Sequence, residues 1–185
     1  GNPVLDRLFE EHLATWDRIQ HSNDPEPLVE FLLRYPSGWF AELAELRLDQ
    51  VLERQGEGKI AIQSSPDNPF SKGSGSMNTA YRVGDMYSYR EMDIYTRQHT
   101  GDVVSVVTKI GESEIFFGDG RVTDLLGNVL VSPGRFIRSH NQITPREFSV
   151  GKRWSTRFNV TGSTGNLYVQ DFSVRVADRE RVTVP

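Results

Sequence analysis

Residues 102–131 read DVVSVVTKIGESEIFFGDGRVTDLLGNVLV, a pattern of short apolar segments separated by turns. It begins with a run of mostly β-branched residues, 102–110, and continues as short apolar segments. Tight-turn sequences separate these segments at 111–113, 118–120 and 127–128, where Gly, Asn and Asp tolerate the positive φ that hairpin turns need. The stretch therefore predicts consecutive antiparallel strands joined by short turns.

The flanking sequence extends this pattern over residues 81–185. Further strands are expected at 81–94, 154–160, 167–176 and 181–185. In the second of these, Trp154, Thr156, Phe158 and Val160 alternate with Arg153, Ser155, Arg157 and Asn159, which predicts one buried and one solvated face. The expected aromatic core is Tyr81, Tyr87, Tyr89, Tyr95, Phe116, Phe117, Trp154, Phe158 and Phe172. The whole predicts an antiparallel β meander, as a curved sheet or half-barrel.

Residues 1–55 have the periodicity of helices instead. Apolar residues recur at three- and four-residue steps from Leu5 to Ile19. Asp24 before Pro25 predicts an N-cap and the first residue of a second helix. A third helix is expected from Phe40, and Gly56 is expected to end it. The aromatic residues Trp16, Phe31, Tyr35, Trp39 and Phe40 are expected to pack these helices together.

Composition supports the same division. The helical segment 1–55 carries 11 Asp and Glu but only 5 Lys and Arg. The β segment 81–185 carries 12 Asp and Glu and 14 Lys and Arg. Residues 56–80 are rich in Gly, Pro and Ser, which predicts a flexible linker, with a short strand as an alternative at 60–62. The expected fold class is thus α+β: a three-helix module at 1–55, a linker at 56–80 and an antiparallel β-domain at 81–185.

Length, charge and cysteine content exclude several classes of function. The chain has 185 residues, a formal net charge of −4 and no cysteine. Disulfides, thiol nucleophiles, cysteine zinc sites and iron–sulfur clusters are therefore excluded. The acidic balance argues against a general nucleic-acid binder, and no run of apolar residues is long enough for a transmembrane helix.

No motif in the sequence carries a recognisable catalytic, cofactor or metal site. The four histidines are too far apart in sequence for a local metal motif. Asp119, Asp124 and Asn128 are interpreted as turn residues, because the alternating ligands of a calcium loop are missing. Carboxylates at Asp93, Asp102, Glu112 and Glu114 allow the alternative of a carboxylate-dependent hydrolase, but solvated hairpin faces explain them as well.

Residues 135–157 form a basic segment whose members are Arg135, Arg138, Arg146, Lys152, Arg153 and Arg157. This segment could contact an anionic headgroup, an acidic partner or the acidic helical segment of the same chain, and an ordinary mixed surface explains it as well. Trp39 follows a glycine in a turn and is expected either to be exposed or to dock on the β-domain. The candidate contact residues are Trp39, Arg135, Arg138, Arg153 and Arg157.

Residues 35–48, YPSGWFAELAELRL, resemble a turn that joins two helices of a tetratricopeptide-like hairpin in bacterial extracytoplasmic proteins. Residues 16–19 and 22–25 are similar to the same module, which also occurs beside bacterial caspase-like domains. In those proteins the catalytic His and Cys lie in another domain, so this resemblance implies no catalytic residue here. It implies a short tetratricopeptide-like helical module.

The second half resembles β-domains of bacterial periplasmic proteins and lipoproteins of unassigned function. The shared phrases are residues 83–89, 122–128, 150–154 and 180–185. In such domains the last phrase continues into further strands, so the resemblance implies a chain truncated at its C-terminus. It also implies a curved sheet or half-barrel, a fold sometimes used to hold lipid acyl chains.

Together these observations predict a non-enzymatic binding or scaffolding protein outside the cytoplasm, in the periplasm or cell envelope. A carrier of lipids or hydrophobic ligands on the concave face of the sheet is a second hypothesis. A carboxylate-dependent hydrolase is a third, and a docking module whose helical groove binds a partner is a fourth. The expected partner is a protein or a hydrophobic small molecule, with no cofactor and no nucleic acid.

Overall fold

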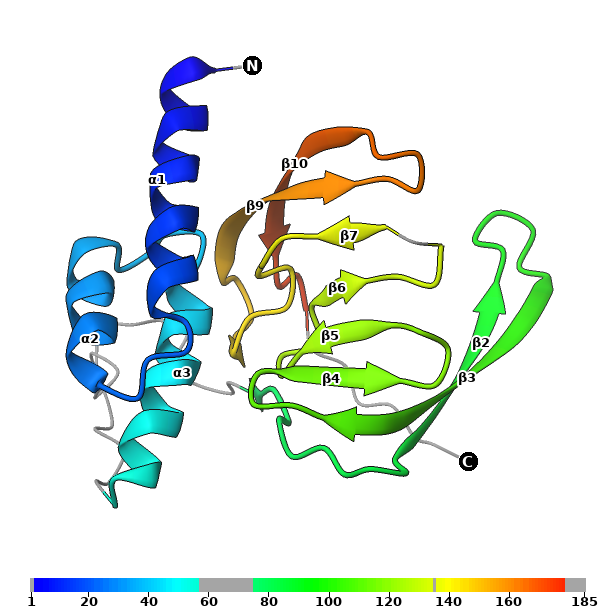
Figure 1. Ribbon diagram of the computed structural model, residues 1–185. Helices are drawn as coiled ribbons and strands as arrows, with labels where there is room; N and C mark the ends of the chain where they lie inside the picture. The colour runs from blue at the N-terminus through cyan, green and yellow to red at the C-terminus, as the bar shows by residue number, and fades with distance from the viewer. Residues whose placement is uncertain (1, 57–74, 135, 179–185) are drawn as a thin grey trace. The chain divides into compact units, whose positions relative to one another are not determined.

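The computed structural model describes residues 2–56, 75–134 and 136–178. Three helices come first, namely α1 (Pro3–Ile19), α2 (Pro25–Arg34) and α3 (Ala41–Arg54) (Figure 1). The strands that follow are β1 (Gly75–Ser76), β2 (Met86–Met92), β3 (His99–Ile110), β4 (Glu114–Phe117), β5 (Val122–Asp124), β6 (Val129–Val131), β7 (Ile137–Arg138), β8 (Glu147–Phe148), β9 (Arg153–Thr161) and β10 (Leu167–Arg175). The predicted α+β fold class is confirmed.

Eight of these strands form one open sheet in the order β10-β9-β7-β6-β5-β4-β3-β2. Its neighbouring strands run antiparallel, so the predicted meander is confirmed. The stretch from 135 to 149, for which the sequence predicted no strand, contributes β7 to this sheet. It also contributes β8, which pairs with β1 in a separate two-stranded sheet.

The chain forms two compact units. The first combines the three helices and β1 with residues 140–158 and 169–178, and the second contains residues 78–139 and 159–168. Most of the predicted linker at 56–80, including the alternative strand at 60–62, lies outside the described residues, as does the strand expected at 181–185. The domain boundaries drawn from composition stay predictions.

Local sequence explains where the helices begin and end. The Asn2 side chain accepts hydrogen bonds from the N–H groups of Val4 and Leu5 at the start of α1. Asp24 accepts from the N–H of Glu26 at 3.0 Å, which confirms it as the N-cap of α2. Gly56 follows α3 with φ of +72°, a conformation that glycine adopts without strain. None of the helices within the described ranges is long and apolar enough to span a bilayer.

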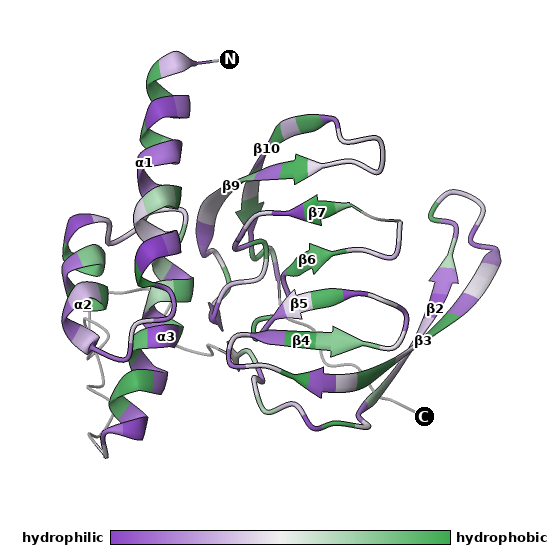
Figure 2. Ribbon diagram, in the orientation of Figure 1, coloured by the Kyte–Doolittle hydropathy of each residue, from purple (hydrophilic) through white to green (hydrophobic). Residues whose placement is uncertain are grey.

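Aromatic rings hold the three helices together, as the sequence predicted. Trp16 of α1 is buried, and its ring stacks on that of Phe40 and also lies 6.1 Å from that of Phe31. Hydrophilic and hydrophobic residues alternate along each helix, so each has an apolar stripe to bury (Figure 2). The buried Arg47 of α3 donates to the carbonyl oxygens of His21 and Ser22, and thereby fixes the turn between α1 and α2.

The second unit has its core on one face of β3, β4 and β5. Val107, Ile115 and Phe117 are almost fully buried there, and Leu126 joins them from the turn after β5. Phe158, in the first unit, is also buried as predicted. The prediction of a core position was wrong for three aromatic residues that are exposed: Tyr89, Tyr95 and Phe172. Tyr89 and Phe172 lie on the edge strands β2 and β10, and Tyr95 lies in the turn after β2, where fewer neighbours cover a side chain.

Strand β9 departs from its predicted alternation at one residue. Thr156, Phe158 and Val160 are buried, as expected for one face. Arg157 was expected on the solvated face, but it is 5% exposed. Helix α1 explains this difference, because Asp6 and the ring of Phe9 lie against the Arg157 guanidinium.

Candidate functional site

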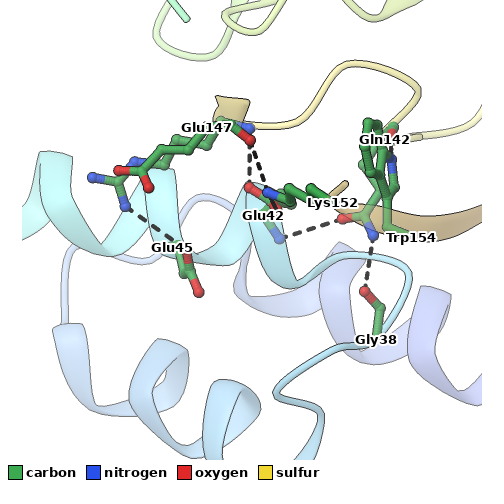
Figure 3. Close-up of polar contacts among 8 residues, drawn as sticks. Gly38, Glu42, Glu45, Gln142, Glu147, Lys152 and Trp154 are labelled. Carbon is green, nitrogen blue, oxygen red and sulfur yellow. Dashed lines mark hydrogen bonds and ion pairs between the residues drawn. The ribbon is translucent and has the colours of Figure 1, made fainter. Parts of the chain in front are cut away.

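Basic residues after β7 meet an acidic face of α3 within the first unit (Figure 3). Glu42, Glu45 and Asp49 lie on this face because they are three and four residues apart. The Lys152 ammonium donates to one oxygen of Glu42 at 2.6 Å, and the backbone N–H of Arg146 donates to the other at 2.9 Å. The Arg146 guanidinium pairs with Asp49 and lies 3.8 Å from Glu45. Contact with the chain's own acidic helix, one of the three predicted contacts, is thus present in the structure.

Burial raises the pKa of Glu45, and the neighbouring Glu42 carboxylate raises it further. Arg146 and Lys152 oppose this effect with their positive charge. A carboxylate with a raised pKa beside a second carboxylate is what an acid–base pair requires. Here, however, both oxygens of Glu42 already accept hydrogen bonds from within the chain. The arrangement holds α3 to the segment that contains β8 and β9.

Gln142 completes this contact by capping α3. Phe40, the residue before the helix, provides no side-chain hydrogen bond to its N-terminus. The N–H of Glu42 instead donates to Gln142 Oε1 at 3.3 Å, and Gln142 Nε2 donates to the carbonyl of Gly38 at 2.9 Å (Figure 3). Trp154 Nε1 donates to the Gln142 carbonyl at 2.7 Å and holds the capping residue in place. A cap 100 residues away in sequence is invisible to local pattern analysis.

The candidate contact residues lie in different surroundings. Trp39 is half-buried, with its ring 5.6 Å from that of Phe9 and 5.1 Å from that of His12. Arg157 is buried against α1, while Arg153 on the same strand is exposed. Arg138 is half-buried in the second unit, and Arg135 lies outside the described residues. Their role in binding a ligand or partner stays a prediction.

Asp124 organises a buried turn in the second unit. Its Oδ1 accepts hydrogen bonds from the N–H groups of Leu126 and Asn128, and its Oδ2 accepts from the Asn128 amide at 3.0 Å. Burial raises the pKa of Asp124 to about 7, and these donors oppose the rise. Asp119 in the preceding turn accepts from the N–H of Arg121. The interpretation of Asp119, Asp124 and Asn128 as turn residues is confirmed.

A groove of about 380 Å³ lies between α1 and α2. It is lined by Thr15, Arg18, Ile19, Pro27, Glu30, Phe31, Arg34 and Tyr35. Arg34 lies 5.1 Å above the Tyr35 ring, and its guanidinium pairs with Glu11 at 2.8 Å. The lining includes the apolar residues Ile19, Pro27 and Phe31, and its two arginines lie on different helices, Arg18 on α1 and Arg34 on α2.

A two-stranded arm, residues 88–104, extends from the rest of the sheet of the second unit (Figure 1). In the arm, β2 pairs with β3 from the Ser88–Val104 pair to the tip. Strand β4 pairs with β3 only at Val107 and later residues, so it does not reach the arm. The large apolar side chains exposed on the arm are Tyr89, Met92, Ile94, Tyr95, Val103 and Val104. The sequence predicted a strand over 81–94, with Tyr89 and Tyr95 in the core. The missed signal is that apolar residues occupy both alternating positions of β2, which pairs only with β3 among the described strands.

The tip of the arm is a well-formed turn. Asp93 Oδ1 accepts hydrogen bonds from the N–H groups of Tyr95 at 2.9 Å and Thr96 at 2.6 Å. The hydrogen bond from Thr96 is the main reason that the pKa of Asp93 is lowered. The N–H of Arg97 donates to the Asp93 carbonyl at 2.8 Å, and Arg97 adopts a positive φ of 56°. The turn thus fixes the apolar side chains of Ile94 and Tyr95, 81% and 89% exposed, in outward positions.

Comparison with known proteins gives no further assignment. This sequence matches no protein-family model, and neither a curated protein nor a solved structure matches it. Within the described ranges, no group of three or more His, Asp or Glu side chains is arranged to hold a metal ion.

Proposed function

We propose that this protein is a non-enzymatic binding or scaffolding protein that holds an extended segment of a partner protein along β2. The observation that carries the proposal is the arm: among the described residues its outer strand β2 pairs only with β3, and its apolar side chains are exposed. A free strand edge offers unpaired N–H and C=O groups to another strand. Burial of each large apolar side chain on that edge would stabilise a complex by about 1–2 kcal/mol.

Preorganisation supports this function. A two-stranded hairpin is at most marginally stable on its own in water. The hydrogen bonds of the Asp93 turn order the tip of the arm, so less conformational entropy is lost there when a partner strand is added. A third strand would also cover the apolar side chains of Met92 and Tyr89, which are half exposed in the isolated chain.

We further propose that the protein acts outside the cytoplasm, in the periplasm or cell envelope of a bacterium. This location rests on the resemblances of residues 35–48 and of the β segment to envelope proteins. The lipid-carrier and hydrolase hypotheses have less support among the described residues. The groove found there lies between helices rather than on the sheet, and the Glu42 carboxylate is already paired.

A peptide-display experiment with the whole chain tests the proposal. Peptides selected on the immobilised protein are titrated into the ¹⁵N-labelled chain and followed by NMR. The amide signals of β2 are expected to shift, and their hydrogen exchange to slow. Shifts confined to α1 and α2 would contradict this and favour the hypothesis of a helical docking module. Failure to select any peptide would also contradict it.

Matched variants locate the binding surface. Met92→Lys places a charge on β2, and Leu8→Lys places one on α1 at a residue of similar exposure, 41% against 48%. Met92→Lys is expected to weaken peptide binding about tenfold, because it removes an apolar contact and puts a charge on the edge. Leu8→Lys is expected to leave the affinity unchanged. Equal affinities for the two variants would overturn the assignment to β2.

A further inference from the structure

Arg121 lies on the buried face of the β4–β5 hairpin. The Phe117 N–H donates to the Arg121 carbonyl at 2.9 Å, so the two side chains stand opposite each other. The guanidinium carbon is 4.2 Å from the centre of the Phe117 ring and 5.8 Å from that of Tyr89. Stacking of this kind occupies the faces of the guanidinium and leaves its edges for hydrogen bonds.

One edge of this guanidinium is buried and unused. Nε and Nη2 of Arg121 have almost no accessible surface, and neither has a hydrogen-bond partner in the described part of the chain. These two nitrogens point their N–H groups to the same side, where arginine holds a carboxylate through two parallel hydrogen bonds. Burying charged N–H donors without an acceptor costs free energy. An acceptor atom from a ligand would remove this cost.

The neighbouring carboxylates do not supply that atom. Asp119 lies in the preceding turn, where its Oδ1 accepts from the backbone N–H of Arg121 and its Oδ2 from Ser105 Oγ at 2.6 Å. Both carboxylate oxygens of Asp124 accept hydrogen bonds from residues of its own turn. A second buried donor group, Thr123 Oγ1, also lacks a partner within the described residues. Thr123 is two residues from Arg121 and therefore on the same face.

We propose that Arg121 is the anchor of a binding site for a small organic carboxylate. The carboxylate accepts two hydrogen bonds from Nε and Nη2, and its organic part contacts the rings of Phe117 and Tyr89. A planar carboxylate matches the two parallel N–H groups, and the aromatic rings suit an apolar body. This site lies wholly within the second unit, and it shares only Tyr89 with the strand-binding surface proposed above.

Entry to the site requires a side chain to move, because the two donors have no exposed area. Tyr89 is the neighbour best placed to do so. It lies on the edge strand β2 and is 47% exposed, whereas Phe117 is buried. A shortened side chain at this position, as in Tyr89→Ala, is therefore expected to speed association of the carboxylate without removing its anchor.

The test uses three probes on the whole chain, namely benzoate, neutral benzamide and inorganic phosphate. Each is titrated while the Arg121 Nε–H signal and the affinity are followed by NMR and calorimetry. Benzoate is expected to bind and to shift that signal, while benzamide and phosphate bind at least about tenfold more weakly. Phosphate binding as tightly as benzoate overturns the assignment of a carboxylate, and no shift with any probe overturns the site.

Substitutions separate charge from geometry. Arg121→Lys keeps the charge but loses the paired donors, and it is expected to weaken benzoate binding about tenfold. Arg121→Gln is expected to abolish binding, and Arg90→Gln, at an exposed arginine on β2, to leave it unchanged. Unaltered affinity in Arg121→Gln overturns the proposal. If the Arg121 variants fail to fold, the Nε–H titration of the native chain decides the question.

Discussion

Arg157 on β9 pairs with Asp6 on α1 although 151 positions separate the two residues. The arginine is buried, whereas the Asp6 side chain is about half exposed. A second nitrogen of the guanidinium lies 3.5 Å from Asp171 of β10, and its carbon lies 5.6 Å from the centre of the Phe9 ring. One side chain thus connects the first helix to the last two strands inside the first unit.

Replacing this arginine is expected to destabilise the chain. Arg157→Met should lower the free energy of unfolding by about 2 kcal/mol, because it removes the hydrogen bond to Asp6, the ion pair with Asp171 and the contact with Phe9. Urea denaturation measures the change. Arg153→Met is the matched control, since Arg153 lies on the same strand but is exposed. Equal stability of the two variants would show that the Asp6–Arg157 pair contributes nothing.

Loss of the Gln142 cap of α3 should lower the free energy of unfolding by less than loss of Arg157. Gln142→Ala removes the acceptor for the Glu42 N–H and the donor to the Gly38 carbonyl. The expected decrease in the free energy of unfolding is about 1–2 kcal/mol, typical of a lost N-cap and one buried hydrogen bond. Gln98→Ala, at an exposed glutamine, provides the control in the same urea experiment. A decrease no larger than that of the control would argue against the capping role.

Asp124 should make stability fall as the pH rises. Its pKa is raised from 3.8 in the unfolded chain to about 7 in the folded chain. Below pH 3.8 the carboxyl is neutral in both states and its contribution is fully present. Between these values the unfolded chain loses the proton first, so the free energy of unfolding decreases with pH.

Asp124→Asn, which does not titrate, isolates this effect. Relative to this variant, the native chain should lose stability between about pH 4 and about pH 7 and then remain level. Urea denaturation over a pH series measures the difference, and a ¹³C titration of the Asp124 carboxyl should give a midpoint near 7. A stability difference independent of pH would contradict the raised pKa.

His12 should show the opposite pH dependence. It is buried beside the Tyr35 ring, and its Nδ1 has no hydrogen-bond partner in the part of the chain that the structure describes. Burial lowers its pKa below 6.5, with Glu11 opposing and Arg34 assisting the shift. Its contribution to stability is therefore complete above pH 6.5 and is lost as the pH falls toward the folded value.

NMR titration of the imidazole checks this prediction directly. The midpoint for His12 in the folded chain should lie below that of the same residue in urea. His12→Leu should also remove a component of the stability that decreases with acidification below pH 6.5. A folded-state midpoint at or above the urea value would contradict the expectation.

Local patterns predicted the elements of this fold well where a short stretch carries its own signal. Asp24 before Pro25 marked the start of α2, and the glycine-containing turns marked the hairpins from β3 to β6. The short strands β7 and β8 were missed, because strands of two residues have no periodicity to detect. The exposure of Tyr89 and Tyr95 was also missed, since it depends on which strand lies at the edge of the sheet.

The candidate surfaces were harder to foresee. The basic segment was recognised from its composition, and contact with the acidic helix was one of its three predicted contacts. Which charges meet was not predictable: Lys152 pairs with Glu42, and Arg157 with Asp6, across more than 100 residues. The unpaired edge of Arg121 likewise has no sequence signal, because it depends on which groups surround the guanidinium in space.

The sequence was sufficient to predict the α+β class, the Asp24 cap of α2 and the antiparallel order of neighbouring strands, since these depend on backbone preferences and on residues a few positions apart. Three features followed only from the tertiary structure: Arg157 is buried, Gln142 caps α3, and the arm at 88–104 exposes apolar side chains. Burial and pairing depend on segments brought together from distant parts of the chain. A local sequence pattern therefore cannot predict which residues will contact a given side chain.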